Sequence, residues 1–309
     1  MAESVTFGAR STADKVLAGI DLTGRHFVVT GCNSGIGFET MSALAANGAH
    51  VIGLARHAAD AKSAALRAGP SVTPLACDLA DLDSIAAAAG AIRELQIPLD
   101  AIVANAAIAY LPTLETRYGV EMQFLVNHLG HFALVNGLTD LVRSGTGRIV
   151  IVSSGTGIAQ APAEGIMFDN LDGRRFYEPR TFYGQSKLAN ALFAKELSRR
   201  LSARGIAVNS LHPGATRGTR LNRNAALPRR IALTAAHWFM RSPLRGAATQ
   251  ALLAANPGVG GVSGEFWSDC RITRGNPRLE DAGLAARLWE VSQDIIARHG
   301  ARPELREAA

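Results

Sequence analysis

The chain has 309 residues, of which 48% are hydrophobic and 19% are charged, and its formal net charge is +6 at pH 7. This composition supports a sizeable hydrophobic core and excludes a disordered chain. The chain has no apolar run of about 18 residues and no apolar segment near its start. We therefore expect a cytoplasmic protein without a membrane span.

Apolar runs typical of buried strands alternate with helical patterns from His26 onward. Strands are expected at 26–30, 50–55, 72–76, 101–104, 148–153, 207–211 and 264–267. Helices are expected at 35–47, 60–68, 81–95, 115–143 with a break, 182–203 and 244–255. This alternation predicts an α/β fold of the Rossmann type. Its doubly wound parallel sheet should have about seven strands in the order 3-2-1-4-5-6-7, with helices on both faces.

The chain has no internal repeat and no low-complexity linker. We therefore predict a single domain over 25–296, with a lead-in at 1–24 and a C-terminal tail at 297–309. Two long segments, 155–181 and 215–243, do not fit the alternation. Long insertions in compact domains are usually lids or binding loops, so we expect both to border a substrate.

Neither a metal site nor a nucleic-acid interface is indicated. Cys32, Cys77 and Cys270 are widely spaced and form no metal-ligand pair, which is typical of a reducing compartment. The basic residues are scattered, and their densest cluster lies at 217–230. We interpret that cluster as solvated surface or as attraction for an anionic small molecule rather than as a nucleic-acid site.

A glycine-rich turn follows the first strand directly and opens the first long helix. Glycines at such a turn let the backbone approach a pyrophosphate, which then lies at a helix N-terminus. The alternative is a purely structural turn. We expect the turn to bind a dinucleotide through Gly31, Asn33, Ser34, Gly35, Ile36 and Gly37.

The end of the second strand bears on the choice between NAD and NADP. An acidic residue there would hold the ribose 2′-hydroxyl, but the chain has Leu54-Ala55-Arg56-His57. Arg56 could pair with a 2′-phosphate, which favours NADP(H) over NAD(H). The alternative is that Arg56 is simply a surface residue.

Two further strand ends carry candidate cofactor residues. Asp78 and Leu79 follow the third strand, where the carboxylate could accept from an adenine amino group or could cap the next helix. Asn105, Ala106 and Ala107 follow the fourth strand, where small residues would let the cofactor cross the sheet edge.

Tyr183 and Lys187 are four residues apart in a predicted helix, so their side chains should lie on one face. The phenol of Tyr has a pKa of about 10, and a nearby positive charge lowers it. Such a pair can exchange protons near neutral pH, although the spacing alone also occurs by chance.

Together these motifs resemble the short-chain dehydrogenase/reductase family, in the same order along the chain. The closer similarity is to the retinol dehydrogenase and WW-domain oxidoreductase branch, and it covers about 11–295. It is carried by the lead-in at 11–24, by 126–132, by 183–196 and by the segment 266–292. The family motifs are the turn at 30–37, Asp78-Leu79, Asn105-Ala106-Ala107, Asn127, Ser153-Ser154, Tyr183 with Lys187, and Pro213-Gly214.

The resemblance implies a catalytic tetrad. Tyr183 would be the general acid in carbonyl reduction and the base in alcohol oxidation, and Lys187 would lower its pKa and hold the nicotinamide ribose. Ser154, with Ser153 as the alternative, would bind the substrate oxygen. Asn127 would hold a water that relays protons to Lys187, or would only satisfy buried backbone groups.

The resemblance also implies that Pro213 and Gly214 border the nicotinamide. The family's usual carboxamide-binding threonine is replaced by Gly218, which leaves Thr216 and Thr219 as candidates. Relatives often form homodimers through helices beside the active site, so a homodimer is a candidate assembly.

The function expected is therefore NADP(H)-dependent reduction of a ketone or aldehyde, or oxidation of the corresponding alcohol. Tyr177, Phe182, Leu221 and Trp238 lie in or next to the two insertions and favour an apolar, polycyclic or secondary-metabolite substrate. One alternative is a non-catalytic cofactor-binding regulator. Another is a nucleotide-sugar epimerase, for which the turn spacing and the C-terminal segment are wrong.

Overall fold

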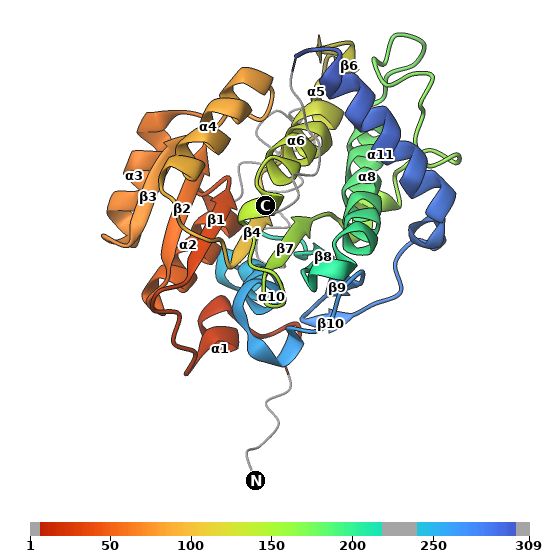
Figure 1. The fold of residues 1–309 in the computed structure, drawn as a ribbon. Coiled ribbons are helices and arrows are strands. Elements are labelled where there is room, and N and C mark those ends of the chain that lie inside the picture. The colour runs from red at the N-terminus through yellow and green to blue at the C-terminus, as the bar shows by residue number, and fades with distance from the viewer. Residues whose placement is uncertain (1–6, 218–239, 301–309) are drawn as a thin grey trace.

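The computed structural model describes residues 7–217 and 240–300, and its centre is one eight-stranded sheet (Figure 1). The strand order is β10-β9-β8-β7-β4-β1-β2-β3. All neighbouring pairs are parallel except β9 with β10. The strands are β1 His26–Thr30, β2 His50–Ala55, β3 Val72–Ala76, β4 Ala101–Ala104, β7 Arg148–Val152, β8 Ala207–His212, β9 Phe266–Ser268 and β10 Arg271–Ile272.

The predicted sheet is confirmed in its type and in its strand order. The seven predicted strands correspond to β1, β2, β3, β4, β7, β8 and β9, and they run in the order expected. The structure adds the short antiparallel edge strand β10, which the sequence prediction lacked. Left-handed backbone at Asp269 and Cys270, with φ of 56° and 59°, reverses the chain between β9 and β10.

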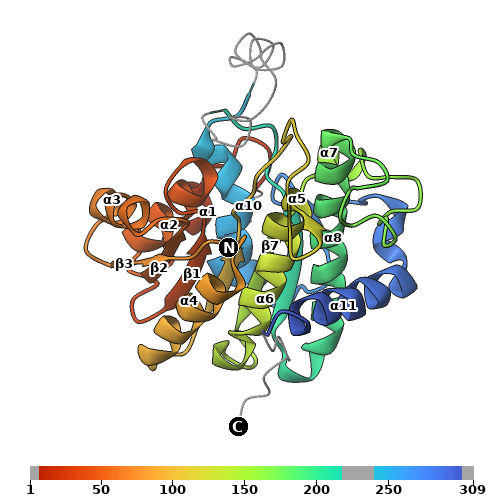
Figure 2. The ribbon, with the colours of Figure 1, turned by 90° about the horizontal axis from the view of Figure 1, so that it is seen from above.

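Helices cover both faces of the sheet, as Figure 2 shows from above. One face is packed by α1 Ala13–Leu17, α2 Gly35–Ala46, α3 Ala58–Ala68 and α10 Pro243–Ala255. The other is packed by α4 Leu82–Glu94, α6 Gly130–Asn136, α8 Pro179–Arg200 and α11 Ala282–Ala297. Shorter helical turns are α7 Gly155–Ile158, Thr139–Leu141, Ser202–Arg204, Pro257–Val259 and Pro277–Glu280.

The prediction of a helix over 115–143 was wrong at its start. The strands β5 Thr116–Arg117 and β6 Val120–Glu121 form a hairpin there. Tyr118 and Gly119 have φ of 57° and 71° and make its tight turn, because left-handed residues match the twist of paired strands. The helical part then runs as α5 Met122–Phe124, a π-helical turn Leu125–Leu129, and α6.

The C-terminal helix α11 packs on α8 (Figure 1) and reaches α6 through Trp289. Its Trp289 is buried against the rings of Phe132 and Phe193, with centroid distances of 4.9 and 5.9 Å. The guanidinium of Arg200 lies 4.2 Å from the centre of the Trp289 ring. Helix α11 therefore completes the core on this face of the sheet.

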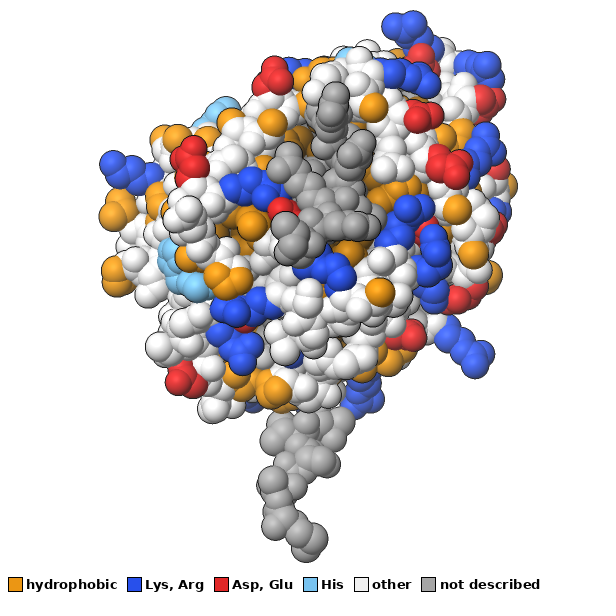
Figure 3. All heavy atoms as spheres, in the orientation of Figure 1, with side chains coloured by type: hydrophobic (Ala, Val, Ile, Leu, Met, Phe, Trp, Pro, Cys, Tyr) orange, Lys and Arg blue, Asp and Glu red, His pale blue; other side chains and the backbone are white. Residues whose placement is uncertain are grey.

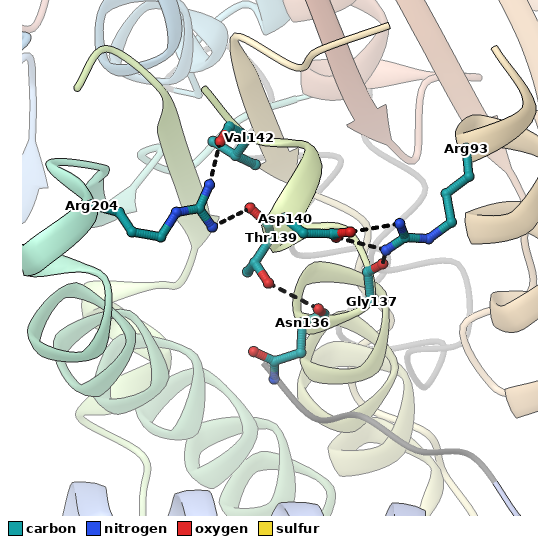
Figure 4. Close-up of polar contacts among 7 residues, drawn as sticks. All are labelled: Arg93, Asn136, Gly137, Thr139, Asp140, Val142 and Arg204. Atoms are coloured by element: carbon teal, nitrogen blue, oxygen red, sulfur yellow. Dashed lines mark hydrogen bonds and ion pairs between the residues drawn. The ribbon is translucent and has the colours of Figure 1, made fainter. Parts of the chain in front are cut away.

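Two arginines clamp the loop between α6 and β7 (Figure 4). Arg93 from α4 makes two hydrogen bonds of 2.7 Å to the Asp140 carboxylate and also donates to Gly137 O. Arg204 donates to the backbone oxygens of Thr139 and Val142, each at 2.7 Å. These bonds satisfy three loop carbonyls and hold the loop that leads to β7, whose carboxyl end reaches the candidate site.

Basic side chains are spread over the surface with acidic ones among them, as one face shows in Figure 3. Of the predicted basic cluster at 217–230, only Arg217 lies within the described residues. Within 7–217 and 240–300, no helix has the length and apolar character needed to cross a membrane.

Candidate active site

A cavity of about 730 Å³ opens at the carboxyl ends of β1, β2, β3, β4, β7 and β8. Ligands bind at this edge in open parallel sheets. Of the predicted catalytic residues, Ser154, Tyr183 and Lys187 line it and Asn127 does not. The predicted cofactor residues all line it, namely Gly31, Asn33, Ser34, Gly35, Ile36, Gly37, Arg56, Asp78, Leu79, Asn105, Ala106, Ala107, Tyr183, Lys187, Pro213, Gly214 and Thr216.

The glycine-rich turn has the geometry that a pyrophosphate requires. Gly31 and Gly35 have φ of 68° and 56°, and α2 begins at Gly35 with its free N–H groups at the cavity. A Cβ atom at Gly37 would lie 2.3 Å from Gly31 O and 2.5 Å from the Asn105 Nδ2 atom. The turn can therefore approach β4 only with glycine at 37, and its residues fit a dinucleotide.

A hydrogen-bonded chain behind the turn joins β1, β4 and the π-helical segment. The Thr30 hydroxyl accepts from the N–H groups of Asn105 and Ala106 at 2.8 and 3.0 Å. His131 Nδ1 lies 2.9 Å from Asn127 O and must donate to it, so Nε2 is the acceptor for the Thr30 hydroxyl at 2.9 Å. Burial lowers the pKa of His131 to about 4, which keeps this ring neutral.

Two guanidinium groups lie near the part of the cavity beside β2 and the glycine-rich turn. Arg56 is exposed there and its Nε donates to His57 Nε2 at 3.1 Å. Arg67 from α3, which the sequence analysis missed, donates to Asn33 O at 3.0 Å and lies over the Phe38 ring. Asp60, in the first turn of α3, also lines the cavity. Neither Arg67 nor Asp60 belongs to a recognisable motif. Both lie in α3, and it is the packing of this helix that brings them near the cavity.

Asp78 does not cap the next helix. Its Oδ1 accepts from Ala80 N at 3.0 Å in a local turn, and the cap of α4 is Asp81, which accepts from the N–H groups of Asp83 and Ser84. Asp78 and Leu79 remain at the cavity wall, where the adenine position was expected.

Tyr183 and Lys187 lie on the cavity side of α8, 4% and 2% exposed. Lys187 Nζ donates to Val152 O at 3.2 Å and lies 5.9 Å from the centre of the Tyr183 ring. Burial lowers the pKa of Lys187 to about 7. The next residue in α8, Gly184, is required by packing, because a Cβ there would lie 2.4 Å from the backbone of Gln160.

The two serines that follow β7 differ in their hydrogen bonds. Ser153 Oγ donates to Lys187 O at 2.6 Å, so its only proton is used to brace α8. Ser154 Oγ accepts from Gly157 N at 3.0 Å and lies 3.2 Å from the Thr156 hydroxyl. Both serines line the cavity, but only the Ser154 hydroxyl lies beside a second lining hydroxyl, that of Thr156. This arrangement favours Ser154 as the group that faces a substrate.

Asn127 is fully buried beneath the cavity floor. Its amide accepts from Ile108 N at 2.8 Å and donates to Ile108 O and to Ser186 Oγ, each at 2.9 Å. Ser186 in turn donates to Tyr183 O at 2.8 Å. The side chain therefore ties the segment after β4 to the turn of α8 that carries Tyr183.

Two aromatic residues that were expected to border a substrate lie outside the cavity lining. Tyr177 and Phe182 pack on each other instead, with ring centroids 5.2 Å apart. Tyr110 and Leu111 do line the cavity. Thr216 is at the wall with its hydroxyl 3.2 Å from Gly214 O, while Thr219, Leu221 and Trp238 lie outside the described residues.

The chain matches a family model described as short chain dehydrogenase over residues 25–167. It is 38% identical over 301 residues to the human WW domain-containing oxidoreductase, covering 94% of this chain and 72% of that protein. It is 38% identical over 292 residues to mouse retinol dehydrogenase 14, covering 88% and 86% of the two chains. It is also 35% identical over 303 residues to the chloroplastic short-chain dehydrogenase TIC 32 B of Brassica napus, covering 94% of each.

Among solved structures, an uncharacterised protein from Mycobacterium paratuberculosis superposes with a TM-score of 0.72 at 32% identity, over 90% of this chain and 95% of that one. The fold and the cavity define a nicotinamide-binding oxidoreductase class. The chain belongs to the short-chain dehydrogenase/reductase family, in the branch that contains the WW-domain oxidoreductases and the retinol dehydrogenases.

Proposed function

We propose that this protein is an NADP(H)-dependent oxidoreductase that interconverts a ketone or aldehyde with its alcohol, with Tyr183 as general acid and base. The observation that carries the proposal is the convergence of Ser154, Tyr183 and Lys187 on the same cavity as the glycine-rich turn. A bound nicotinamide would supply or accept the hydride. The protein must then supply a proton and stabilise the developing charge on oxygen.

In the direction of reduction, Tyr183 would donate its phenolic proton to the carbonyl oxygen while Ser154 hydrogen-bonds the same atom. General acid catalysis of this kind contributes roughly 10²–10⁴-fold. Lys187 would favour the phenolate through its positive charge and would hold the ribose beside it. A bound anionic cofactor would in turn favour the ammonium form of Lys187, because opposite charges raise the pKa of an amine.

We propose that Asn127 acts by positioning rather than by holding a relay water with its amide. All three of its side-chain hydrogen bonds go to Ile108 and Ser186, which leaves the amide committed to the two segments that border the cavity. The π-helical turn around Asn127 is of a kind often found at functional sites.

The preference for NADP(H) rests on Arg56 at the cavity wall, with Arg67, which donates to Asn33 O, as a second nearby cation. The test is a panel of carbonyl and alcohol substrates assayed with NADPH and NADH in parallel. We expect a higher kcat/KM with NADPH, and Arg56→Ala should weaken NADPH but not NADH. A wild-type preference for NADH would contradict the role of Arg56.

The alternative is a cofactor-binding regulator without turnover, which would bind NADPH and convert no member of that panel. We also propose a cytoplasmic location. Relatives include a chloroplastic protein, so cell fractionation is the test. A homodimer remains a candidate assembly, and α11 packs on α8 beside the active site.

A further inference from the structure

Tyr110 is an aromatic wall of the cavity that no sequence motif indicates. It follows β4 by six residues, lines the cavity and is half-buried. Its ring lies against that of Tyr183, with centroids 4.8 Å apart and planes tilted by 42°. Offset and tilted aromatic pairs of this kind attract each other beyond the area they bury. Tyr110 therefore contacts the proposed catalytic phenol from the side of the β4 loop.

The backbone of Tyr110 is strained. Its φ is 58°, in the left-handed region that a bulky side chain rarely occupies. Such a conformation persists only where the surroundings fix it, and these outliers gather at functional sites. Contacts elsewhere in the fold must therefore hold Tyr110 in this conformation.

Gln123 makes the contacts that hold the backbone of Tyr110 in this conformation. Its Oε1 accepts from Tyr110 N at 2.6 Å, and its Nε2 donates to Glu121 Oε1 at 3.1 Å and to Pro179 O at 3.3 Å. Gln123 and Glu121 are both fully buried. Pro179 is the first residue of α8, the helix that carries Tyr183, and α5 lies beside that helix (Figure 2). The Gln123 side chain therefore joins the loop that carries Tyr110 to the start of α8.

We propose that Tyr110 determines substrate specificity by presenting its ring beside Tyr183, so that the site favours carbonyl compounds with a flat ring next to the reacting carbon. This inference rests on the proposed oxidoreductase function. Binding pockets gain affinity from aromatic walls and orient the ligand with a few polar groups. Here Ser154 and Tyr183 would fix the carbonyl oxygen, and Tyr110 would contact the adjoining ring. The hydrogen bonds of Gln123 hold the Tyr110 ring in place before a ligand binds. A flat substrate would therefore lose little free energy in ordering this ring.

Two variants separate the ring from the backbone. Tyr110→Gly removes the ring and accepts the left-handed conformation, so the relief of backbone strain offsets part of the lost ring packing and we expect the variant to fold. Tyr110→Phe keeps the ring. Both are assayed with a bicyclic aryl ketone, 1-tetralone, and with a linear aliphatic ketone, 2-octanone, together with thermal melting and direct NADPH binding.

We expect Tyr110→Gly to lose about tenfold or more in kcat/KM for the aryl ketone and less than about threefold for the aliphatic one. Tyr110→Phe should stay within about threefold of wild type for both. NADPH binding should be unchanged in both variants. An equal loss for the two ketones, or no loss, would overturn the specificity role while the wild type remains an active oxidoreductase. A wild type that converts neither ketone nor any other panel member would defeat the oxidoreductase proposal itself, and this inference with it.

Discussion

The Lys187 ammonium lies 5.9 Å from the centre of the Tyr183 ring and 3.2 Å from Val152 O, in a position 2% exposed to solvent. The helical spacing of four residues brings the two side chains to one cavity, and the end of β7 fixes the amine. Burial, not a neighbouring charge, is what lowers the pKa of Lys187 to about 7. The charge that would tune Tyr183 therefore depends on what else occupies the cavity.

Cofactor affinity should depend on pH through Lys187. Its pKa near 7 in the protein alone means that the ammonium form is lost as pH rises above that value, whereas an anionic cofactor favours this form. We expect NADPH to bind more weakly at about pH 9 than at about pH 6, with net proton uptake on binding near neutral pH. Isothermal titration in buffers of different ionisation enthalpy measures both effects. Lys187→Met should bind with little pH dependence, and a wild-type affinity that does not change with pH would contradict the coupling.

Acid should destabilise the fold through two buried histidines. Burial lowers the pKa of His128 to about 3 and of His131 to about 4, so both are neutral in the folded protein while the unfolded chain takes up protons below about 6.5. Above about pH 6.5 the two histidines do not lower the free energy of unfolding. Below that value the free energy of unfolding falls as pH drops, by roughly 4 kcal/mol in total at about pH 5.

Urea unfolding at a series of pH values tests this expectation. His128→Leu should be less stable at neutral pH, because it loses the hydrogen bond to Ser292, but should show a shallower acid dependence. The exposed His57→Gln is the control and should follow the wild-type curve. A wild type equally stable at about pH 5 and pH 7 would contradict the burial argument.

The close approach at Gly37 gives a prediction that needs no substrate. Gly37→Ala would place a Cβ 2.3 Å from Gly31 O, so the turn must shift away from β4. We expect a loss of about 1–3 kcal/mol in stability and at least about tenfold weaker NADPH binding. Gly90→Ala in α4 is the matched control, since its Cβ would meet nothing within 4 Å, and it should stabilise the helix by up to about 1 kcal/mol. Unchanged NADPH binding in Gly37→Ala would remove the turn from the cofactor site.

The clamp at the start of β7 should contribute stability without affecting turnover. Arg93→Met breaks two bonds to the partly buried Asp140 and one to Gly137, and we expect a loss of about 2 kcal/mol. The exposed pair Arg175–Asp169 is the control, since such pairs contribute less than about 1 kcal/mol and Asp169→Asn should be near neutral. Chemical unfolding and kcat/KM are measured together. A drop in kcat/KM beyond the fraction unfolded would show that the clamp reaches the site.

The sequence predicted those parts of the fold that depend on short stretches of neighbouring residues. The apolar strands, the glycine turn and the Tyr183–Lys187 spacing all lie within short windows, and the residues they name do border one cavity. The hairpin at 116–121 was missed because two left-handed residues, Tyr118 among them, interrupt an otherwise helical pattern. Tyr110 and Arg67 were missed because only tertiary contacts, to Gln123 and to Asn33, bring them to the site. Tyr177 and Phe182 illustrate the reverse, since their aromatic character predicted a substrate contact but they pack on each other.

Tyr183→Phe is the most direct test of the proposed chemistry, because it removes one oxygen atom and keeps the ring that Tyr110 contacts. The measurement is NADPH consumption with the best carbonyl substrate of the panel, alongside NADPH binding to the same preparation. We expect kcat to fall by at least about 10²-fold with cofactor affinity within about threefold of wild type. Turnover at the wild-type rate would contradict the assignment of Tyr183 as the proton donor.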